Sequence, residues 1–241
     1  KAAMVYPTAI LGVAVAVVTV LLVWVIPIFE NMFKEFGGAA LPAPTQVVIN
    51  LSQWTKDNFI LIILFAGALV FLWKYIRKQP RGLEVTDDLF LKAPVFGPLI
   101  RKIAVARFTR TLGTMISSGV PILEALDITA RAAGNKTVEK AIYRARQSIS
   151  EGKTVAEPIM QSKVFPPMVC QMINVGEQTG ALDTMLGKIA DFYDEEVDAA
   201  VKGLTSLMEP AMMVILGGLI GGLVVAMYLP IFEMAGNLKA G

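Results

Sequence analysis

Three apolar blocks, separated by mixed polar segments, dominate the hydrophobicity pattern of the chain. Residues 2–29 and 210–232 carry no charge, and residues 59–76 carry only Lys74. A membrane-spanning helix needs about 20 predominantly apolar residues, and uncharged runs of that length are rare in soluble cores. The pattern therefore predicts three membrane-spanning helices, at residues 1–29, 58–76 and 208–232.

Lysine and arginine are distributed unevenly around these blocks, and this distribution predicts an orientation. The segment between the first two blocks has only Lys34 and Lys56, and Lys239 alone follows the third block. A basic cluster follows the second block: Arg77, Lys78, Arg81, Lys92, Arg101, Lys102, Arg107 and Arg110. Basic residues stay on the cytoplasmic side of a membrane. We therefore expect a cytoplasmic segment at 77–207, a periplasmic loop at 30–57 and a periplasmic tail at 233–241.

The segment between the second and third spans reads as helical, with apolar positions at helical spacing and no strand pattern. Helix starts are indicated at Pro121, Asn135 and Pro166-Pro167, and helix stops at Gly119, Gly134, Gly152 and Gly180. Thr154 with Glu157 resembles a capping box before a short helix. A long last helix starts at Ala181 and continues into the third span.

Helices joined by short turns pack against their neighbours in antiparallel pairs. The predicted fold class is therefore an all-α membrane protein, with three transmembrane helices and a cytoplasmic antiparallel bundle of about six helices.

The first and third blocks resemble each other. Pro7 is followed by an apolar run and then by Pro27-Ile28-Phe29-Glu30, and Pro210 is followed at the same spacing by Pro230-Ile231-Phe232-Glu233. The match indicates a duplicated unit of bundle plus span, so we expect a further helical bundle before Lys1. Because proline cannot donate the helical hydrogen bond, Pro27 and Pro230 are expected to end their helices at the outer interface. Glu30 and Glu233 would then mark the outer water boundary.

Composition argues against catalysis and nucleic-acid binding. The chain has no histidine, a single cysteine (Cys170) and a formal net charge of only +2. Histidine is the commonest general base and metal ligand, and no P-loop, nucleophile elbow or metal-ligand spacing is present. We expect no enzymatic activity, no cofactor, no metal and no nucleic-acid partner. Cys170 is expected to be a small buried residue in a reducing compartment.

An acidic run on the predicted last helix leaves two interpretations open. Its members are Asp191, Asp194, Glu195, Glu196 and Asp198. The run is either a solvated face or an acidic docking surface that could bind a divalent cation.

Several short motifs together resemble the type II secretion F / PilC family. They are Gly119-Val120-Pro121-Ile122-Leu123-Glu124-Ala125-Leu126, Val175-Gly176-Glu177-Gln178-Thr179-Gly180 with Leu182, Leu41-Pro42-Ala43-Pro44-Thr45, and Met208-Glu209-Pro210. The resemblance covers essentially the whole chain and the second half of the family pattern, without the first cytoplasmic bundle of that family. Residues 225–230 are most similar to the pilus branch of the family.

This resemblance implies a non-enzymatic assembly platform in the bacterial inner membrane. It implies as partners a hexameric pilus assembly ATPase, with a retraction ATPase as a second candidate. It also implies contacts with pilin transmembrane helices and with other inner-membrane alignment proteins, and a homodimer. The platform would couple the ATPase to the extraction of pilin from the bilayer and its addition to a fibre.

Candidate partner-binding residues lie in the bundle and in the last span. Five basic residues have spacings compatible with one exposed face, which would be either a motor contact or merely solvated: Arg131, Lys136, Lys140, Arg144 and Arg146. The family motif adds Glu177, whose alternative role is to shape a helix end. In the last span Gly217, Gly218, Gly221 and Gly222 allow another helix to approach closely, within the protein, in a homodimer or in a pilin-facing groove.

A small membrane channel or transporter subunit is the alternative function. The spans lack the buried charges and broken helices expected of ion pathways, which argues against it.

Overall fold

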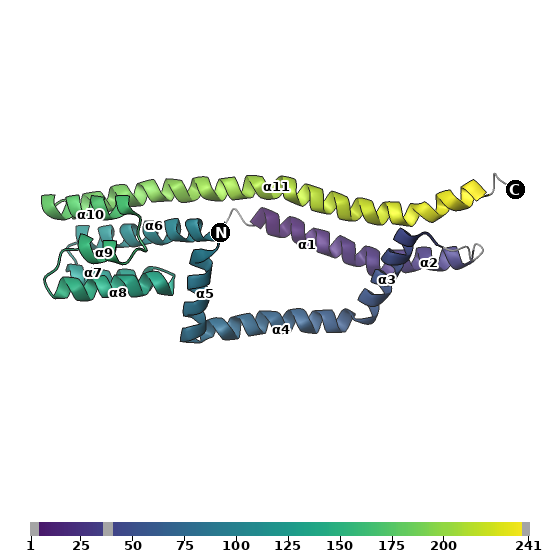
Figure 1. The fold of residues 1–241 in the computed structure, drawn as a ribbon, viewed down its shortest axis with the longest axis horizontal. Helices are drawn as coiled ribbons and strands as arrows, with labels where there is room; N and C mark the ends of the chain where they lie inside the picture. The colour runs from purple at the N-terminus through teal and green to yellow at the C-terminus, as the bar shows by residue number, and fades with distance from the viewer. Residues whose placement is uncertain (1–4, 36–40, 238–241) are drawn as a thin grey trace. The chain divides into compact units, whose positions relative to one another are not determined.

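The computed structural model describes residues 5–35 and 41–237, with side chains at 5–33 and 41–232. All regular structure in these ranges is helical. Three helical stretches are long and apolar enough to cross a membrane: Val5–Phe33, Phe59–Lys78 and Leu182–Phe232. The predicted fold class, an all-α membrane protein with three spans, is confirmed (Figure 1).

The chain divides into two compact units, residues 1–72 with 202–241 and residues 73–201. The first, here the membrane unit, holds α1 (Val5–Val20), the π-helical turn η2 (Leu21–Val25), α2 (Ile26–Glu35), α3 (Ala43–Asp57), most of α4 (Phe59–Lys78) and the end of α11 (Leu182–Asn237). Its small core joins Leu22, Ile26, Ile49 and Leu223. No residue of α4 is buried.

Pro27 does not end the first span, contrary to the prediction. The helix continues through Pro27 to Glu35, and a π-helical turn lies directly before the proline. In this turn the amide of Ile26 donates to the carbonyl of Leu21, five residues back. Pro230 likewise lies inside α11, which runs on to Asn237. Both prolines are therefore internal to their helices.

The segment 30–57 is largely helical and not an open loop. It holds the end of α2 and the whole of α3. Pro42 occupies the N-cap of α3 and Pro44 its first turn, positions where a missing amide breaks no helical bond. Glu30, expected at the water boundary, is only 7% exposed. The side chain of Glu233 lies outside the described residues.

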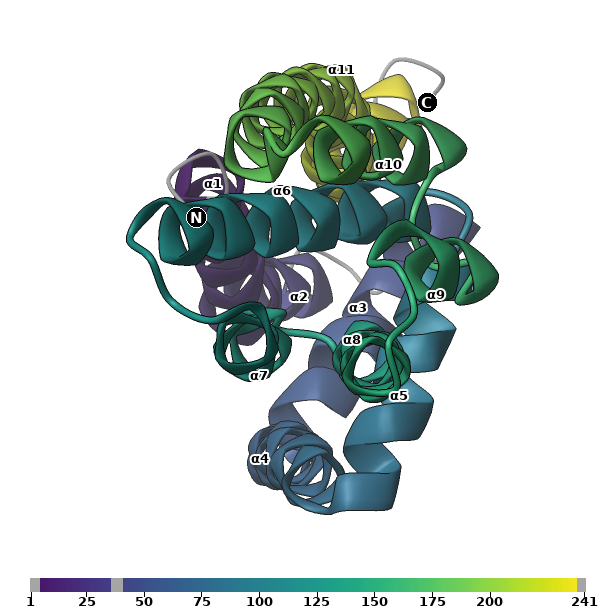
Figure 2. The same cartoon turned by 90° about the vertical axis from the view of Figure 1, so that its left-hand side faces the viewer.

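The second unit, here the bundle unit, contains α5 (Pro80–Lys92), α6 (Phe96–Ser117), α7 (Ile122–Ala132), α8 (Lys136–Ser150), α9 (Ala156–Gln161), α10 (Pro167–Thr179) and the start of α11. Both views show α6 between α10 and the α7–α8 pair (Figures 1 and 2). Phe108, Leu126, Ile142 and Ile173 are among its fully buried core residues.

Most turn signals in this unit are confirmed. The Asn135 side chain accepts hydrogen bonds from the amides of Thr137 and Val138 and so caps α8. Gly180 ends α10 in the left-handed conformation, with φ of 69°. These ends depend on local chemistry, which the sequence displays directly.

The capping box expected at Thr154 and Glu157 is wrong. The N-cap of α9 is Val155, which has no side-chain acceptor, and α9 starts at Ala156. The acceptor comes instead from Glu177 on α10.

Candidate interaction surfaces

A buried aspartate joins the end of the second span to the bundle. Asp87 on α5 is 5% exposed, and its carboxylate accepts from the Arg77 guanidinium at 3.2 Å and from the backbone amide of Lys136 at 2.8 Å. The Asn135 side chain donates to its backbone carbonyl at 3.3 Å. A negative charge at the amino end of α8 is also favoured by the helix dipole. Asp87 therefore holds together the last turn of α4, α5 and the start of α8.

A tight corner fixes α5 against the last turns of α4. At Gly82 a Cβ atom would lie 2.2 Å from the carbonyl oxygen of Ile76, so only glycine permits this approach. The ring of Trp73 meets that of Phe90 edge-on at 6.0 Å. The direction of α5 is thus set by backbone packing, by an aromatic pair and by the Asp87 contacts.

A groove of about 480 Å³ lies between α5 and α8. Its charged lining consists of Arg81, Glu84, Asp88, Lys140 and Arg144. Lys140 pairs with Glu84, and Asp88 pairs with Lys92 at 2.6 Å. Arg81 and Arg144 have no hydrogen-bond or ion-pair partner among the described residues. The groove therefore keeps two uncompensated guanidinium groups.

The five basic residues predicted to share one face are mostly engaged within the chain. Arg131 pairs with Asp127 at 2.6 Å, and Lys136 pairs with Glu139 at 2.6 Å. The Arg146 guanidinium donates to the carbonyl of Leu123 at 3.0 Å. Of the set, only Lys140 and Arg144 meet in the groove.

Glu177 has a structural partner. Its carboxylate accepts from the amide of Val155 at 2.8 Å and from that of Ala156 at 3.3 Å, which satisfies the amino end of α9. Its neighbour Gly176 lies against α11, where a Cβ atom would come within 3.0 Å of Leu182 and Met185. The family motif around residue 177 therefore holds α9, α10 and α11 together.

The acidic run on α11 is partly neutralised by α6. Arg110 pairs with Asp191 at 2.8 Å and with Asp194 at 2.6 Å, and Lys102 pairs with Glu196 at 2.6 Å. The hydrogen bonds to Asp194 and then Asp191 raise the pKa of the Arg110 guanidinium above its ordinary value. Within the described ranges, no cluster of three or more potential metal ligands is present.

Two hydroxyl groups of α3 bond to carbonyls that the prolines leave free. Pro230 has no amide hydrogen for the carbonyl of Ala226, four residues earlier, and the Thr45 hydroxyl donates to that carbonyl at 2.5 Å. In the π-helical register before Pro27, the corresponding free carbonyl is that of Leu22, and the Ser52 hydroxyl donates to it. Thr45 and Ser52 are 3% and 0% exposed.

In lipid a free carbonyl has no water to bond, so hydroxyl side chains commonly satisfy it. We name Thr45 and Ser52 with their two carbonyl acceptors the hydroxyl clamp. The sequence reasoning missed it. The available signal was two small hydroxyl residues seven positions apart on one face of a helix, between two spans that contain proline.

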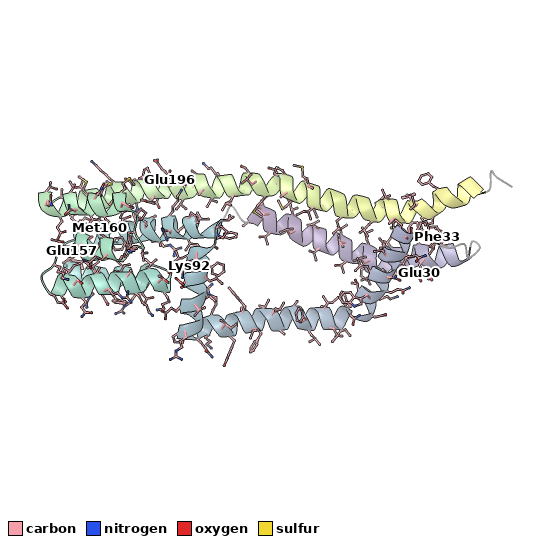
Figure 3. The ribbon with its side chains drawn as sticks, in the orientation of Figure 1. Glu30, Phe33, Lys92, Glu157, Met160 and Glu196 are labelled. Atoms are coloured by element: carbon pink, nitrogen blue, oxygen red, sulfur yellow. The ribbon has the colours of Figure 1, made fainter. Side chains whose placement is uncertain are left out.

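A further polar contact ties α2 to α3. The Gln53 side-chain amide donates to the Glu30 carboxylate at 2.8 Å, and Figure 3 shows Glu30 on the part of α2 beside α3. Together with the hydroxyl clamp, this contact makes α3 the element that joins the first and third spans.

The glycine face of the third span is open. A Cβ atom at Gly217, Gly218, Gly221 or Gly222 would meet nothing within 4 Å among the described residues. The other side of this helix is buried against the core of the membrane unit through Leu223. The glycines are therefore not used for packing between the described helices.

These features define a helical membrane protein whose spans carry a separate, densely packed helical bundle. The family model for the type II secretion system (T2SS), protein F, matches residues 108–230. The chain belongs to this family, which confirms the resemblance seen in the sequence.

Curated relatives are similar over almost the whole chain. It is 56% identical to a type IV pilus assembly protein PilC of Myxococcus xanthus, over 99% of this chain and 57% of the relative. It is 44% identical to a protein of the same name from Pseudomonas aeruginosa, over 99% of this chain and 63% of the relative. A type II secretion system protein F of Vibrio cholerae is 32% identical, over 96% of this chain and 57% of the relative. The chain thus spans about three fifths of the length of these relatives.

Proposed function

We propose that this chain is part of the inner-membrane platform of a type IV pilus, or of the related type II secretion machine. In this role it couples a cytoplasmic assembly ATPase to the extraction of pilin from the membrane and its addition to the fibre, without catalysing a reaction itself. The observation that carries the proposal is family membership, with relatives named as pilus assembly proteins along nearly the whole chain. It favours this role over that of a channel or transporter subunit.

The bundle unit is proposed to face the cytoplasm, on the basis of the basic cluster that follows the second span. The continuity of α11 supports a coupling role. This single helix supplies Leu186 and Ile189 to the core of the bundle unit and Leu223 to that of the membrane unit.

The groove between α5 and α8 is the proposed contact for the motor ATPase. Arg144 keeps an uncompensated positive charge there, so acidic side chains of a partner can pair with it without breaking an existing contact. Arg131, by contrast, already pairs with Asp127.

The test compares Arg144→Gln with Arg131→Gln in the full-length protein reconstituted in nanodiscs. We expect Arg144→Gln to weaken binding of the motor ATPase by about tenfold, which corresponds to ~1.4 kcal/mol for one lost charged contact. Arg131→Gln should bind like the unmodified protein. Failure of the unmodified protein to bind or stimulate the ATPase would contradict the platform role, whereas equal effects of both substitutions would contradict only the groove.

The glycine face of α11 is proposed to receive a transmembrane helix of pilin or of a second copy of this chain. Its support is the open space at Gly217 and Gly221 and the burial of the opposite side. Cross-linking from Gly217→Cys in intact membranes distinguishes the two occupants by the mass of the adduct. No adduct with either protein would contradict this assignment.

A further inference from the structure

An exposed apolar surface lies on α5 and on the turn that follows it. We name it the juxtamembrane patch, and its members with their exposed fractions are Leu89 (68%), Phe90 (37%), Val95 (55%) and Phe96 (54%). Asp87, on the side of α5 opposite Leu89, is buried in the bundle unit. Contiguous apolar surface on a water-soluble unit usually marks a surface that is covered in the functional state.

The location of the patch indicates what covers it. α5 begins two residues after Lys78, the last residue of a membrane-spanning helix. The corner at Gly82 and the contact of Trp73 with Phe90 fix α5 to the last turns of that helix. Figure 1 shows α5 running across the direction of these turns, which belong to the same unit. A helix that leaves the end of a span at a steep angle runs along the membrane surface.

The patch lies on the side of α5 from which the span arrives. Phe90 contacts Trp73 of α4, and Leu89 lies two helical turns after Gly82, whose Cβ position faces the carbonyl of Ile76 in α4. The cationic side chains of Lys74 and Lys78 lie at the same end of the span and are exposed. Apolar and aromatic side chains next to lysines are typical of a helix seated in the headgroup layer, where the cations meet lipid phosphates.

We propose that α5 and the α5–α6 turn form an interfacial segment that binds the lipid surface at the carboxyl end of the second span. Leu89, Phe90 and Phe96 insert below the headgroups, and Lys74 and Lys78 contact phosphates. The inference depends on α4 crossing the membrane and not on the identity of any protein partner. It adds the bilayer surface as a direct ligand of the bundle unit.

The experiment places an environment-sensitive nitrobenzoxadiazole probe at Leu89→Cys in the full-length protein, with Cys170→Ser as background. The protein is reconstituted in nanodiscs of phosphatidylcholine and phosphatidylglycerol, some carrying a nitroxide near the lipid headgroup. Met160→Cys on α9 is the matched control, because Met160 is an apolar residue with 59% exposure in the same unit (Figure 3). Figure 1 shows α9 farther than α5 from the last turns of α4, so the control position lies farther from the end of the span.

We expect the lipid nitroxide to quench the probe at position 89 at least about twofold more than the probe at position 160. Iodide dissolved in the water should quench the probe at position 160 more strongly than the probe at position 89. Leu89→Asp should then reduce lipid quenching of a second probe at Phe96→Cys, while the melting temperature of the bundle is unchanged. Equal iodide quenching at positions 89 and 160 would overturn the proposal. Protection of position 89 from both quenchers would also overturn it, because a protein surface would then cover the patch.

Discussion

At the scale of single residues, the hydroxyl clamp explains how two prolines remain inside membrane helices. Thr45 and Ser52 bond to the carbonyls of Ala226 and Leu22, which have no helical amide because of Pro230 and Pro27. The prediction that both prolines end their helices followed from a local rule and was wrong. It failed because the compensating groups come from α3, which is remote in sequence from α11.

Removing either hydroxyl should destabilise the membrane unit. We expect Thr45→Val and Ser52→Ala each to lower the free energy of unfolding by about 0.5–2 kcal/mol, since a buried carbonyl loses its donor. Unfolding of the reconstituted protein by a denaturing detergent measures this. Thr55→Val is the control on the same helix, because the Thr55 hydroxyl bonds only to an exposed carbonyl one turn back. An effect of Thr55→Val as large as that of Ser52→Ala would contradict the clamp.

Cys170 gives the bundle a dependence on alkaline pH. The thiol is 3% exposed, and burial raises its pKa above the ordinary value of 9.0. Above that pH the unfolded thiol loses its proton while the folded thiol keeps it, so the unfolded state is favoured. The contribution of Cys170 to stability should therefore be constant below about pH 8.5 and fall as the pH rises further. Denaturant midpoints across this range should show a smaller decline for Cys170→Ala, and parallel declines would exclude Cys170 as the cause.

At the scale of elements, helix ends that depend on neighbouring residues were predictable, and ends completed from a distance were not. Asn135 caps α8 and Gly180 ends α10 as expected, because cap chemistry operates within a few residues. The start of α9 was misassigned to Thr154, since its true acceptor, Glu177, comes from another helix. The five basic residues had suitable spacing, but the partners of Lys140 and Arg146, which are Glu84 and the carbonyl of Leu123, became visible only in the fold.

Glu177 should be required for the order of α9. We expect Glu177→Gln to lower the stability of the bundle by about 1–2 kcal/mol, because charged acceptors at helix N-termini contribute amounts of this order. Hydrogen exchange at the amides of Val155 and Ala156 should increase most. Gln178→Ala changes the neighbouring exposed residue and should leave both measurements unchanged. Unaltered exchange at residues 155 and 156 in Glu177→Gln would show that the carboxylate is not the cap.

At the scale of the whole molecule, the apolar blocks predicted the class of fold, and the resemblance of short motifs indicated the family. Three apolar blocks correspond to three candidate spans, and the short motifs around residues 119–126 and 175–182 lie within the region that the family model matches. The π-helical turn and the role of α3 were not predictable, because they depend on contacts between distant segments.

The proposed orientation has a direct test. Gln147→Cys on α8 is exposed, whereas the native Cys170 is buried, so a maleimide should label only the introduced thiol. We expect labelling in inverted membrane vesicles and none by a membrane-impermeant reagent added to intact spheroplasts. The opposite pattern would place the bundle unit in the periplasm and would exclude a contact with a cytoplasmic motor.

The dual attachment of α3 has a mechanical consequence. The helix α3 bonds to the proline site of the first span and to that of the third span. A force that straightens either site must therefore pull a hydroxyl away from a carbonyl and leave that carbonyl facing hydrocarbon. A short-range contact of this kind extends very little under a small force and then breaks abruptly. The first and third spans should therefore move as one body until a threshold force is reached, and separate only beyond it.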